Sequence, residues 1–240
     1  MCEENIKILP LGKNYKIAVS KIHTFGTDAV LLSYFCRTHK YDKICEFGTG
    51  CGIISLLISK DNFFEKIDAL DIQADAIELI NKSIELNDLN EKINAINIDL
   101  KEYNKNEYYD IVVCNPPYKI MNTGLLNKDK GAQIARHEVM CTIEDITKKA
   151  SQILKFGGRL YLCHKPERLC DIITAMKNAK IEPKVLTLVQ QRNSIDPWLM
   201  LIEGKKGGKP GITIGKNLVI ENDDGTYSDN IKKYYEDFII

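Results

Sequence analysis

At positions 115–118 the chain carries the tetrapeptide Asn-Pro-Pro-Tyr, whose groups suit a planar molecule with an NH2 group. It follows the apolar segment 109–114, whose β-branched and aromatic residues predict a buried strand. Two consecutive prolines end the pairing of such a strand and fix a rigid turn. Asn115 and the Pro116 carbonyl then offer hydrogen-bond acceptors, and the Tyr118 ring offers a face for stacking. An ordinary turn after a strand would look the same, so the prediction depends on what else the chain carries.

A glycine-rich segment lies upstream, at residues 43–54, and begins with a short predicted strand that ends in Glu46. Gly48 and Gly50 allow the backbone to come close to a ligand and to adopt positive φ angles. The spacing departs from the dinucleotide fingerprint G-x-G-x-x-G, because Ile53 occupies the place of its last glycine. The carboxylate of Glu46 would repel a pyrophosphate. The segment therefore favours a ligand with a positively charged amine.

Two further predicted strands end in carboxylates that suit other parts of such a ligand. Asp71 lies in the strand 67–72, about 20 residues after the glycines, where an acid can accept hydrogen bonds from ribose hydroxyls. Asp99 follows the strand 93–98 and suits an exocyclic adenine amine. Either acid could instead only cap the end of its strand, but the joint spacing favours a nucleoside-like ligand.

The acid of the glycine-rich segment, its three glycines, the two strand-end acids and the tetrapeptide together resemble the class I S-adenosylmethionine-dependent methyltransferases, specifically those that methylate amino groups. Three other segments, at 25–32, 135–138 and 203–209, resemble the bacterial valine-tRNA adenine-N6 methyltransferases. Those enzymes act on the adenine beside the anticodon. The resemblance covers most of the chain, and its motifs are more specific for the methyltransferase class than for the tRNA substrate.

The resemblance implies S-adenosylmethionine as the cofactor and tRNA as the partner, and it assigns roles to individual residues. The implied catalytic residues are Asn115, Pro116, Pro117 and Tyr118. The implied cofactor-binding residues are Thr27, Asp28, Glu46, Phe47, Gly48, Thr49, Gly50, Asp71, Ile72, Asp99 and Leu100. The implied contacts with RNA are Lys119, Arg136, His137, Lys205, Lys206 and Lys209.

The predicted chemistry starts from the weak nucleophilicity of adenine N6, whose lone pair is delocalised into the ring. Hydrogen bonds from the two N6 protons to the Asn115 side-chain oxygen and the Pro116 carbonyl would favour a localised lone pair, with Tyr118 stacked on the base. Much of the rate enhancement would come from proximity and orientation. No strong base is needed, since the amine becomes acidic only after it has accepted the methyl group.

Other acceptors with an NH2 group remain open at this point. A glutamine-N5 methyltransferase acting on peptide release factors is the nearest alternative, because a side-chain amide presents the same group. A small-molecule amine methyltransferase and a DNA adenine methyltransferase are further alternatives. A module that binds the cofactor or RNA without catalysis is disfavoured, because the tetrapeptide is intact.

Composition sets limits on these functions. The 240 residues carry 33 basic and 33 acidic side chains, and this net charge of zero does not favour a dedicated nucleic-acid binder, which is usually basic. Locally, residues 204–216 hold four lysines and no acid. Eight cysteines without a C-x-x-C pair predict reduced thiols, with neither disulfides nor a metal site. With no predicted signal peptide or membrane span, we expect a cytoplasmic protein without an obligate protein partner.

Strands and helices alternate from residue 43 onward, which predicts an α/β, Rossmann-like fold with helices on both faces of the sheet. Seven strands are expected, six of them parallel. The last is expected to be antiparallel, because the strands at 185–189 and 198–203 are joined without a helix. A helix capped by Thr142 and Asp145 is expected to end at the glycine pair 157–158.

Three segments follow from this pattern. We predict an N-terminal arm or hairpin over residues 1–26, a methyltransferase domain over 27–204 and a C-terminal tail over 205–240. The segment 119–141 shows no clear periodicity and directly follows the tetrapeptide. A long loop in such a place is predicted to act as a lid on the substrate.

Overall fold

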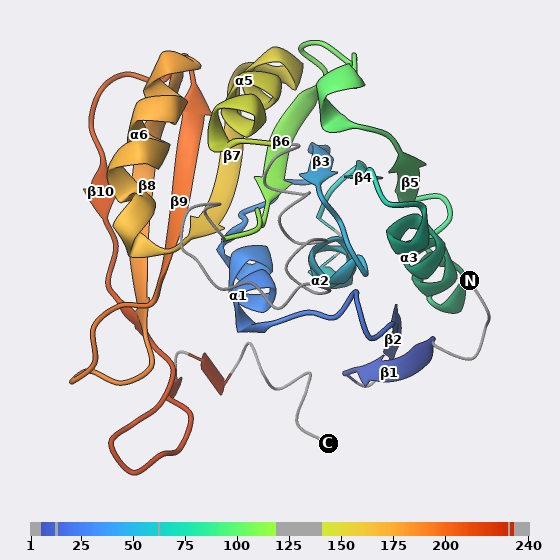
Figure 1. Ribbon diagram of the computed structural model, residues 1–240, viewed down its shortest axis with the longest axis horizontal. Helices are drawn as coiled ribbons and strands as arrows, with labels where there is room; N and C mark the ends of the chain where they lie inside the picture. The colour runs from blue at the N-terminus through green and yellow to red at the C-terminus, as the bar shows by residue number, and fades with distance from the viewer. Residues whose placement is uncertain (1–5, 13, 62, 119–140, 230, 233–240) are drawn as a thin grey trace, which may run out of the picture.

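The computed structural model describes residues 6–12, 14–61, 63–118, 141–229 and 231–232 (Figure 1). The predicted lid lies outside these residues except for Cys141, and so do three of the predicted RNA contacts, Lys119, Arg136 and His137. Their roles stay predictions, as does the division of the chain after residues 26 and 204.

A two-stranded antiparallel hairpin, formed by β1 (Lys7–Leu11) and β2 (Tyr15–Val19), precedes the first helix. It is attached to α3 (Ala74–Leu86) by a buried hydrogen bond of 2.9 Å from the Ala18 N–H to the Ser83 hydroxyl. The segment that follows β2 therefore begins beside α3. It passes the candidate site before the first helix begins.

The central sheet is built on seven long strands: β3 (Lys43–Phe47), β4 (Lys66–Asp71), β5 (Ile93–Asn97), β6 (Tyr109–Cys114), β7 (Leu154–His164), β8 (Ile181–Gln190) and β9 (Leu199–Lys206). Their order across the sheet is β8-β9-β7-β6-β3-β4-β5. Strands β3 to β7 pair in parallel, and β9 lies between β7 and β8, antiparallel to both. The predicted Rossmann-like fold, with six parallel strands and one reversed strand, is confirmed.

Two short strands extend the sheet beyond the seven that the sequence pattern predicts. β10 (Thr213–Ile214) and β11 (Leu218–Val219) each pair in parallel with β8. The sheet therefore has nine strands in the part of the chain that the structure describes. Two residues are too few to show alternation of polar and apolar side chains, which is why the pattern does not indicate these strands.

Helices cover both faces of the sheet because successive strand residues point to opposite faces. One apolar core includes Ile44 and Val113 and packs against the first three helices along the chain. The other includes Cys45 and Val112, which are next to those residues in the same strands, and packs against the last two helices. The helices are α1 (Thr27–Phe35), α2 (Ile53–Asp61) and α3 on one face, and α5 (Ile143–Ile153) and α6 (Leu169–Asn178) on the other. No helix among the described residues combines the length and apolar character that crossing a membrane requires.

The predicted end of α5 is wrong. The capping box of Thr142 and Asp145 is present at its start, but the helix ends at Ile153, and the glycine pair lies inside β7. Between the pairs that flank the irregularity, four residues of β7 lie opposite one residue of β6. Gly157 has a φ of 82°, and a Cβ on Gly158 would lie 3.0 Å from the carbonyl oxygen of Lys155. The glycines therefore permit an irregular strand rather than a helix end.

Candidate active site

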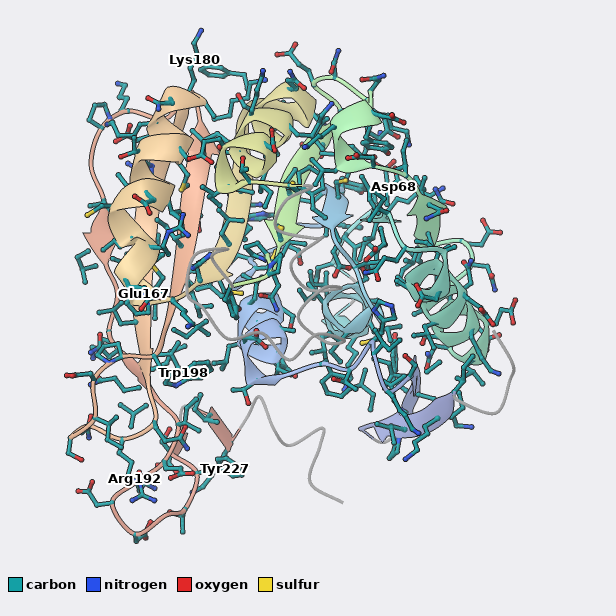
Figure 2. All side chains as sticks on the ribbon, viewed as in Figure 1. Asp68, Glu167, Lys180, Arg192, Trp198 and Tyr227 are labelled. Carbon is teal, nitrogen blue, oxygen red and sulfur yellow. The ribbon has the colours of Figure 1, made fainter. Side chains whose placement is uncertain are left out.

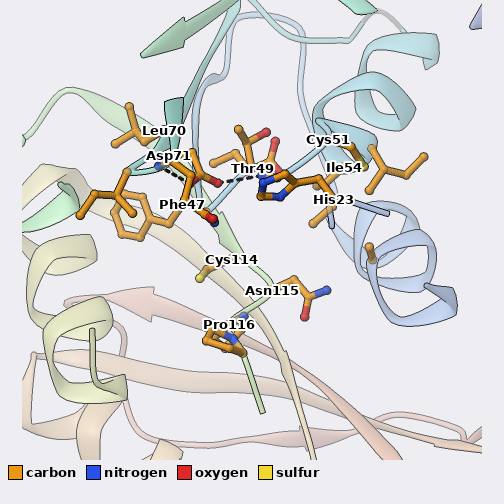
Figure 3. Close-up of a pocket in the computed structure, with 18 of the residues that line it drawn as sticks. His23, Phe47, Thr49, Cys51, Ile54, Leu70, Asp71, Cys114, Asn115 and Pro116 are labelled. Atoms are coloured by element: carbon orange, nitrogen blue, oxygen red, sulfur yellow. Dashed lines mark hydrogen bonds between the residues drawn. The ribbon is translucent and has the colours of Figure 1, made fainter. Parts of the chain in front are cut away.

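The carboxyl ends of β3, β4, β5 and β6 meet at one edge of the sheet, where a cavity of about 460 Å³ opens between them and the start of α1 (Figure 3). Open α/β sheets bind their ligands at this edge. Thr27, at the start of α1, is the one predicted cofactor residue outside the lining, although Gly26 beside it lines the cavity. The lining includes Asn115, Pro116, Pro117 and Tyr118, together with Asp28, Glu46, Phe47, Gly48, Thr49, Gly50, Asp71, Ile72, Asp99 and Leu100.

Glu46, at the end of β3, is the most deeply buried acid of the cavity, with 1% of its surface exposed. Its Oε2 accepts hydrogen bonds from the backbone N–H and the hydroxyl of Ser55 in α2. Its Oε1 has no hydrogen-bond partner among the described residues. Burial raises the pKa of Glu46 to about 7. A buried carboxylate oxygen without a partner fits a ligand amine, because a charged N–H donor would replace the hydrogen bonds that burial removes.

The glycine-rich loop after β3 is held by Asp71, at the end of β4. Asp71 Oδ2 accepts from the Gly50 N–H, and Oδ1 accepts from the Gln73 N–H, both at 2.9 Å. Gly48 and Gly50 have φ angles of 67° and 54°, and a Cβ on either would meet nothing within 4 Å. The loop thus has a fixed shape and leaves open space on its cavity side for a ligand.

Asp99 combines the two roles that the sequence leaves open. Its Oδ1 accepts from the Lys101 N–H at 2.9 Å, so it caps the 3-10 helix η2 (Leu100–Glu102) that follows β5. Asp99 also lines the cavity. The two roles are compatible, because a carboxylate has about four lone-pair sites and the cap uses one of them.

The Asn115 side chain belongs to a hydrogen-bonded cluster that joins three elements. Its Nδ2 donates to Asp28 Oδ2, at the start of α1, over 3.2 Å. Its Oδ1 lies 2.6 Å from the Tyr118 hydroxyl and accepts from the Cys163 thiol, in β7, at 3.0 Å. The Tyr118 hydroxyl also lies 2.8 Å from Asp28 Oδ2. The edge of its ring contacts His164, with the ring centroids 5.2 Å apart.

Burial raises the pKa of both Tyr118 and Cys163, so both groups of this cluster keep their protons at neutral pH. They can therefore act as hydrogen-bond donors to Asn115 and Asp28, and neither can serve as a base. The arrangement agrees with the expectation that the tetrapeptide works by orientation rather than by removing a proton.

Two residues at the site are not indicated by any sequence motif. His23 lies between β2 and α1, lines the cavity, and has its Nε2 3.2 Å from Asp75 Oδ2 in α3. Cys163 has the sequence signal of a core cysteine and no more. Its contact with Asn115 depends on the pairing of β7 with β6, in which Leu162 is opposite Cys114. That register is a property of the folded sheet and is not visible in the local pattern.

Lys205 and Lys206, two of the predicted RNA contacts, lie at the edge of the sheet opposite the cavity. β9 runs antiparallel to β7, and Lys205 is opposite Arg159, which in turn pairs with Ile111 near the start of β6. In Figure 2, Lys180 marks this edge, where β8 is about to begin. Trp198 precedes β9 and marks the other edge, on the side of the cavity.

Lys206 is also engaged within the protein, because its Nζ donates to the Leu154 carbonyl at 2.7 Å. Lys209 follows β9 and is exposed, and its carbonyl accepts from Lys184 Nζ at 3.1 Å. The structure therefore does not bring Lys205, Lys206 and Lys209 together with the tetrapeptide. Any contact that they make with RNA lies away from the cavity.

The fold is one that methyltransferases share. The model of the methyltransferase small domain family matches residues 24–178, and the chain belongs to this family. The enzyme class that the motifs predict is thereby confirmed. Among solved structures, a predicted O-methyltransferase from Agrobacterium tumefaciens has a TM-score of 0.71 at 20% identity, covering 88% of this chain and 96% of that one. The TYW2 protein of M. jannaschii in complex with AdoMet has a TM-score of 0.58 at 11% identity, covering 85% and 87%.

Relatives that match most of the chain carry a more specific name. A tRNA1(Val) (adenine(37)-N6)-methyltransferase from Parabacteroides distasonis is 27% identical over 219 residues, which are 90% of this chain and 90% of the relative. A protein of the same name from Tolumonas auensis is 24% identical and covers 90% of this chain and 89% of its own length. The resemblance to tRNA adenine-N6 methyltransferases that the motifs indicate is confirmed along the length of the chain.

Proposed function

We propose that the protein is an S-adenosylmethionine-dependent methyltransferase that transfers a methyl group to the exocyclic N6 of adenine in tRNA. The observation that carries this proposal is the position of Asn115 in the wall of the same cavity as Glu46, Asp71 and Asp99. Acids suited to a nucleoside that carries an amino acid, and an amide suited to an acceptor amine, thus share one space. The names of the relatives support tRNA as the acceptor.

The residues of the cavity fit S-adenosylmethionine, which supplies an electrophilic methyl group on its sulfonium. Glu46 Oε1 would accept from the ammonium of the methionine part, since this buried oxygen has no other partner among the described residues. Asp71 would accept from the ribose hydroxyls with lone pairs that its two backbone bonds leave free. Asp99 would accept from the adenine amine, and Gly48 and Gly50 leave room for the ligand.

The acceptor side of the cavity would orient an amine for in-line transfer. The Asn115 oxygen and the Pro116 carbonyl would each accept one N–H of the adenine amine, which fixes the nitrogen and favours a localised lone pair. The contribution of the chain is then mainly proximity and orientation. The amine releases a proton only after it has gained the methyl group, so the absence of a base in the tetrapeptide agrees with this chemistry.

The adenine must leave its stack to enter the cavity, at a free energy of a few kcal/mol that is smaller in a loop than in a helix. Lys119, Arg136 and His137 are the proposed contacts with RNA near this base. Lys205 and Lys206, at the opposite edge, would contact only a part of the tRNA that is remote from it. We place the reaction in the cytoplasm.

Methyl transfer from labelled S-adenosylmethionine to defined acceptors tests this proposal. Unmodified tRNA, a peptide release factor and a set of small amines are offered separately to the wild-type protein, and the label is counted in each. We expect label in tRNA only. Label in the release factor or in a small amine would overturn the tRNA assignment and leave the methyltransferase class intact. Cofactor binding by calorimetry without transfer to any acceptor would indicate a binding module.

A further inference from the structure

The orientation of the Asn115 amide is controlled by Asp28, 87 positions earlier in the chain. A carboxamide has a donor end and an acceptor end, and only one orientation turns the acceptor oxygen toward a substrate amine. An ionised carboxylate can only accept hydrogen bonds. Asp28 Oδ2 therefore takes the Nδ2 end of Asn115, which leaves Oδ1 on the side of Tyr118 and Cys163.

The Tyr118 hydroxyl has one proton and three possible acceptors within reach, of which the Cys163 sulfur, at 3.2 Å, is the weakest. Asp28 Oδ2 lies at 2.8 Å and Asn115 Oδ1 at 2.6 Å. A hydrogen bond to a carboxylate is roughly twice as strong as one to a neutral carbonyl, so the charge of Asp28 favours the first of these bonds. Asn115 Oδ1 then has one lone pair occupied by the Cys163 thiol at 3.0 Å and one lone pair free. Without the carboxylate, the Tyr118 proton would occupy that second lone pair.

Asp28 is itself held in place by its surroundings. Its Oδ1 accepts from the Ala29 N–H at 2.9 Å, in the first turn of α1, where the helix dipole favours a carboxylate. Gly26 leaves room for it, because a Cβ at that position would lie 2.7 Å from Asp28 Oδ1. With Oδ1 engaged by the helix, Oδ2 is the oxygen that meets both Asn115 and Tyr118.

We propose that Asp28 is a positioning residue for methyl transfer. It fixes the orientation of the Asn115 amide and takes up the Tyr118 proton, so that a lone pair of the amide oxygen stays available to the substrate amine. The inference rests on the proposed function and deepens it, since the sequence resemblance assigns Asp28 to the cofactor instead. A cofactor contact and a positioning residue differ in a measurable way, because only the first changes cofactor affinity directly.

The experiment uses Asp28→Asn and Asp28→Ser, which both remove the carboxylate and keep a polar side chain in the first turn of α1. Calorimetry gives the Kd of the cofactor, and steady-state methylation of unmodified tRNA gives kcat and KM. We expect kcat to fall about 10- to 100-fold in both variants, with the cofactor Kd within about twofold of the wild-type value. An unchanged kcat, or a Kd that rises as much as kcat falls, would overturn the proposal. Glu78→Gln, on the exposed surface of α3, is the control for loss of an acid.

A double-mutant cycle with Tyr118→Phe separates this role from a merely structural one. If Asp28 acts by attracting the Tyr118 proton, removing that hydroxyl removes the competitor for Asn115 Oδ1. The factor by which Asp28→Asn lowers kcat should be at least about threefold smaller in the Tyr118→Phe background than in the wild type. Equal factors in both backgrounds would refute the competition for the proton. Failure of the proposed function is distinguishable, because it appears in the wild type, as cofactor binding without methylation of tRNA.

Discussion

Replacing Glu46 by glutamine removes a buried charge and keeps the shape of the side chain. The oxygen of the glutamine can keep both hydrogen bonds from Ser55, while its NH2 group takes the place of Oε1, which has no partner among the described residues. The variant therefore isolates the charge of Glu46. Glu46→Gln is expected to act in opposite directions on the stability of the cofactor-free protein and on the affinity for the cofactor.

The effect on stability follows from burial, which raises the pKa of Glu46 from 4.5 to about 7. Between these pH values the folded protein holds a proton that the unfolded chain has released. The free energy of unfolding therefore falls as the pH rises through this window and levels off above it. At about 1.4 kcal/mol per pKa unit, the loss amounts to about 3 kcal/mol at most. The Glu46→Gln variant lacks this titration, so its stability relative to the wild type should rise between pH 5 and pH 8.

The effect on affinity has the opposite sign, because the ionised carboxylate is the form that would bind the ammonium of the cofactor. A charged hydrogen bond contributes about 1.5–3 kcal/mol, so the Kd of the variant should be about 10- to 150-fold higher than that of the wild type at pH 8. At pH 6 only about a tenth of Glu46 is ionised in the free protein, and the difference should shrink about tenfold.

Urea denaturation of the cofactor-free proteins and calorimetry with S-adenosylmethionine, both at several pH values, measure these two effects. Glu78→Gln again serves as the control, because this acid is exposed and lies outside the cavity. Equal cofactor Kd values for the wild type and Glu46→Gln at pH 8 would refute the assignment of Glu46 to the ammonium. A stability difference that does not change with pH would refute the reasoning from burial.

Two other predictions concern stability. Gly52 has a φ of 84°, and a Cβ there would lie 2.6 Å from Ile80 Cγ1 in α3, so Gly52→Ala should lower the free energy of unfolding by about 2–4 kcal/mol. A Cβ on Gly48 would meet nothing within 4 Å, so Gly48→Ala should lower it by only about 1 kcal/mol. Equal losses in urea denaturation would contradict the packing argument. Asp68, 3% exposed in β4, accepts hydrogen bonds from Lys105, Tyr103, Tyr109 and Asn94, so Asp68→Asn should cost about 2–4 kcal/mol of stability. The Kd of the cofactor should stay unchanged, because Asp68 lies outside the cavity lining. A loss of unfolding free energy below about 1 kcal/mol would show that these donors find other partners.

The sequence predicts the sheet well because its long apolar strands alternate with helical segments along the chain. The parallel strands and the reversed β9 follow from the connections alone, since β8 and β9 are joined without a helix. The end of α5 is the exception. A glycine pair is typical both of a helix end and of an irregular strand, and only the pairing of β7 with β6 distinguishes the two.

The candidate site is predictable to the extent that its residues fall in local motifs. Glu46, Asp71 and Asp99 end neighbouring strands, and the topology brings them to one cavity with Asn115. The contacts of Asn115 are not predictable in this way, because Asp28 lies far away in the chain and on another element. The position of the lysines at the end of β9 is not predictable for a related reason, since a run of positive charge does not reveal at which edge of the sheet its strand ends.

Asn115 is proposed to direct methyl transfer to adenine N6. The most direct test is mass-spectrometric nucleoside analysis of unmodified tRNA after incubation with S-adenosylmethionine and either the wild type or Asn115→Ala, at equal occupancy of the cofactor as measured by calorimetry. We expect N6-methyladenosine with the wild type and a loss of at least about 100-fold in its rate of formation with the variant. A methyl group on another atom of the tRNA, or an undiminished rate in Asn115→Ala, would contradict the account.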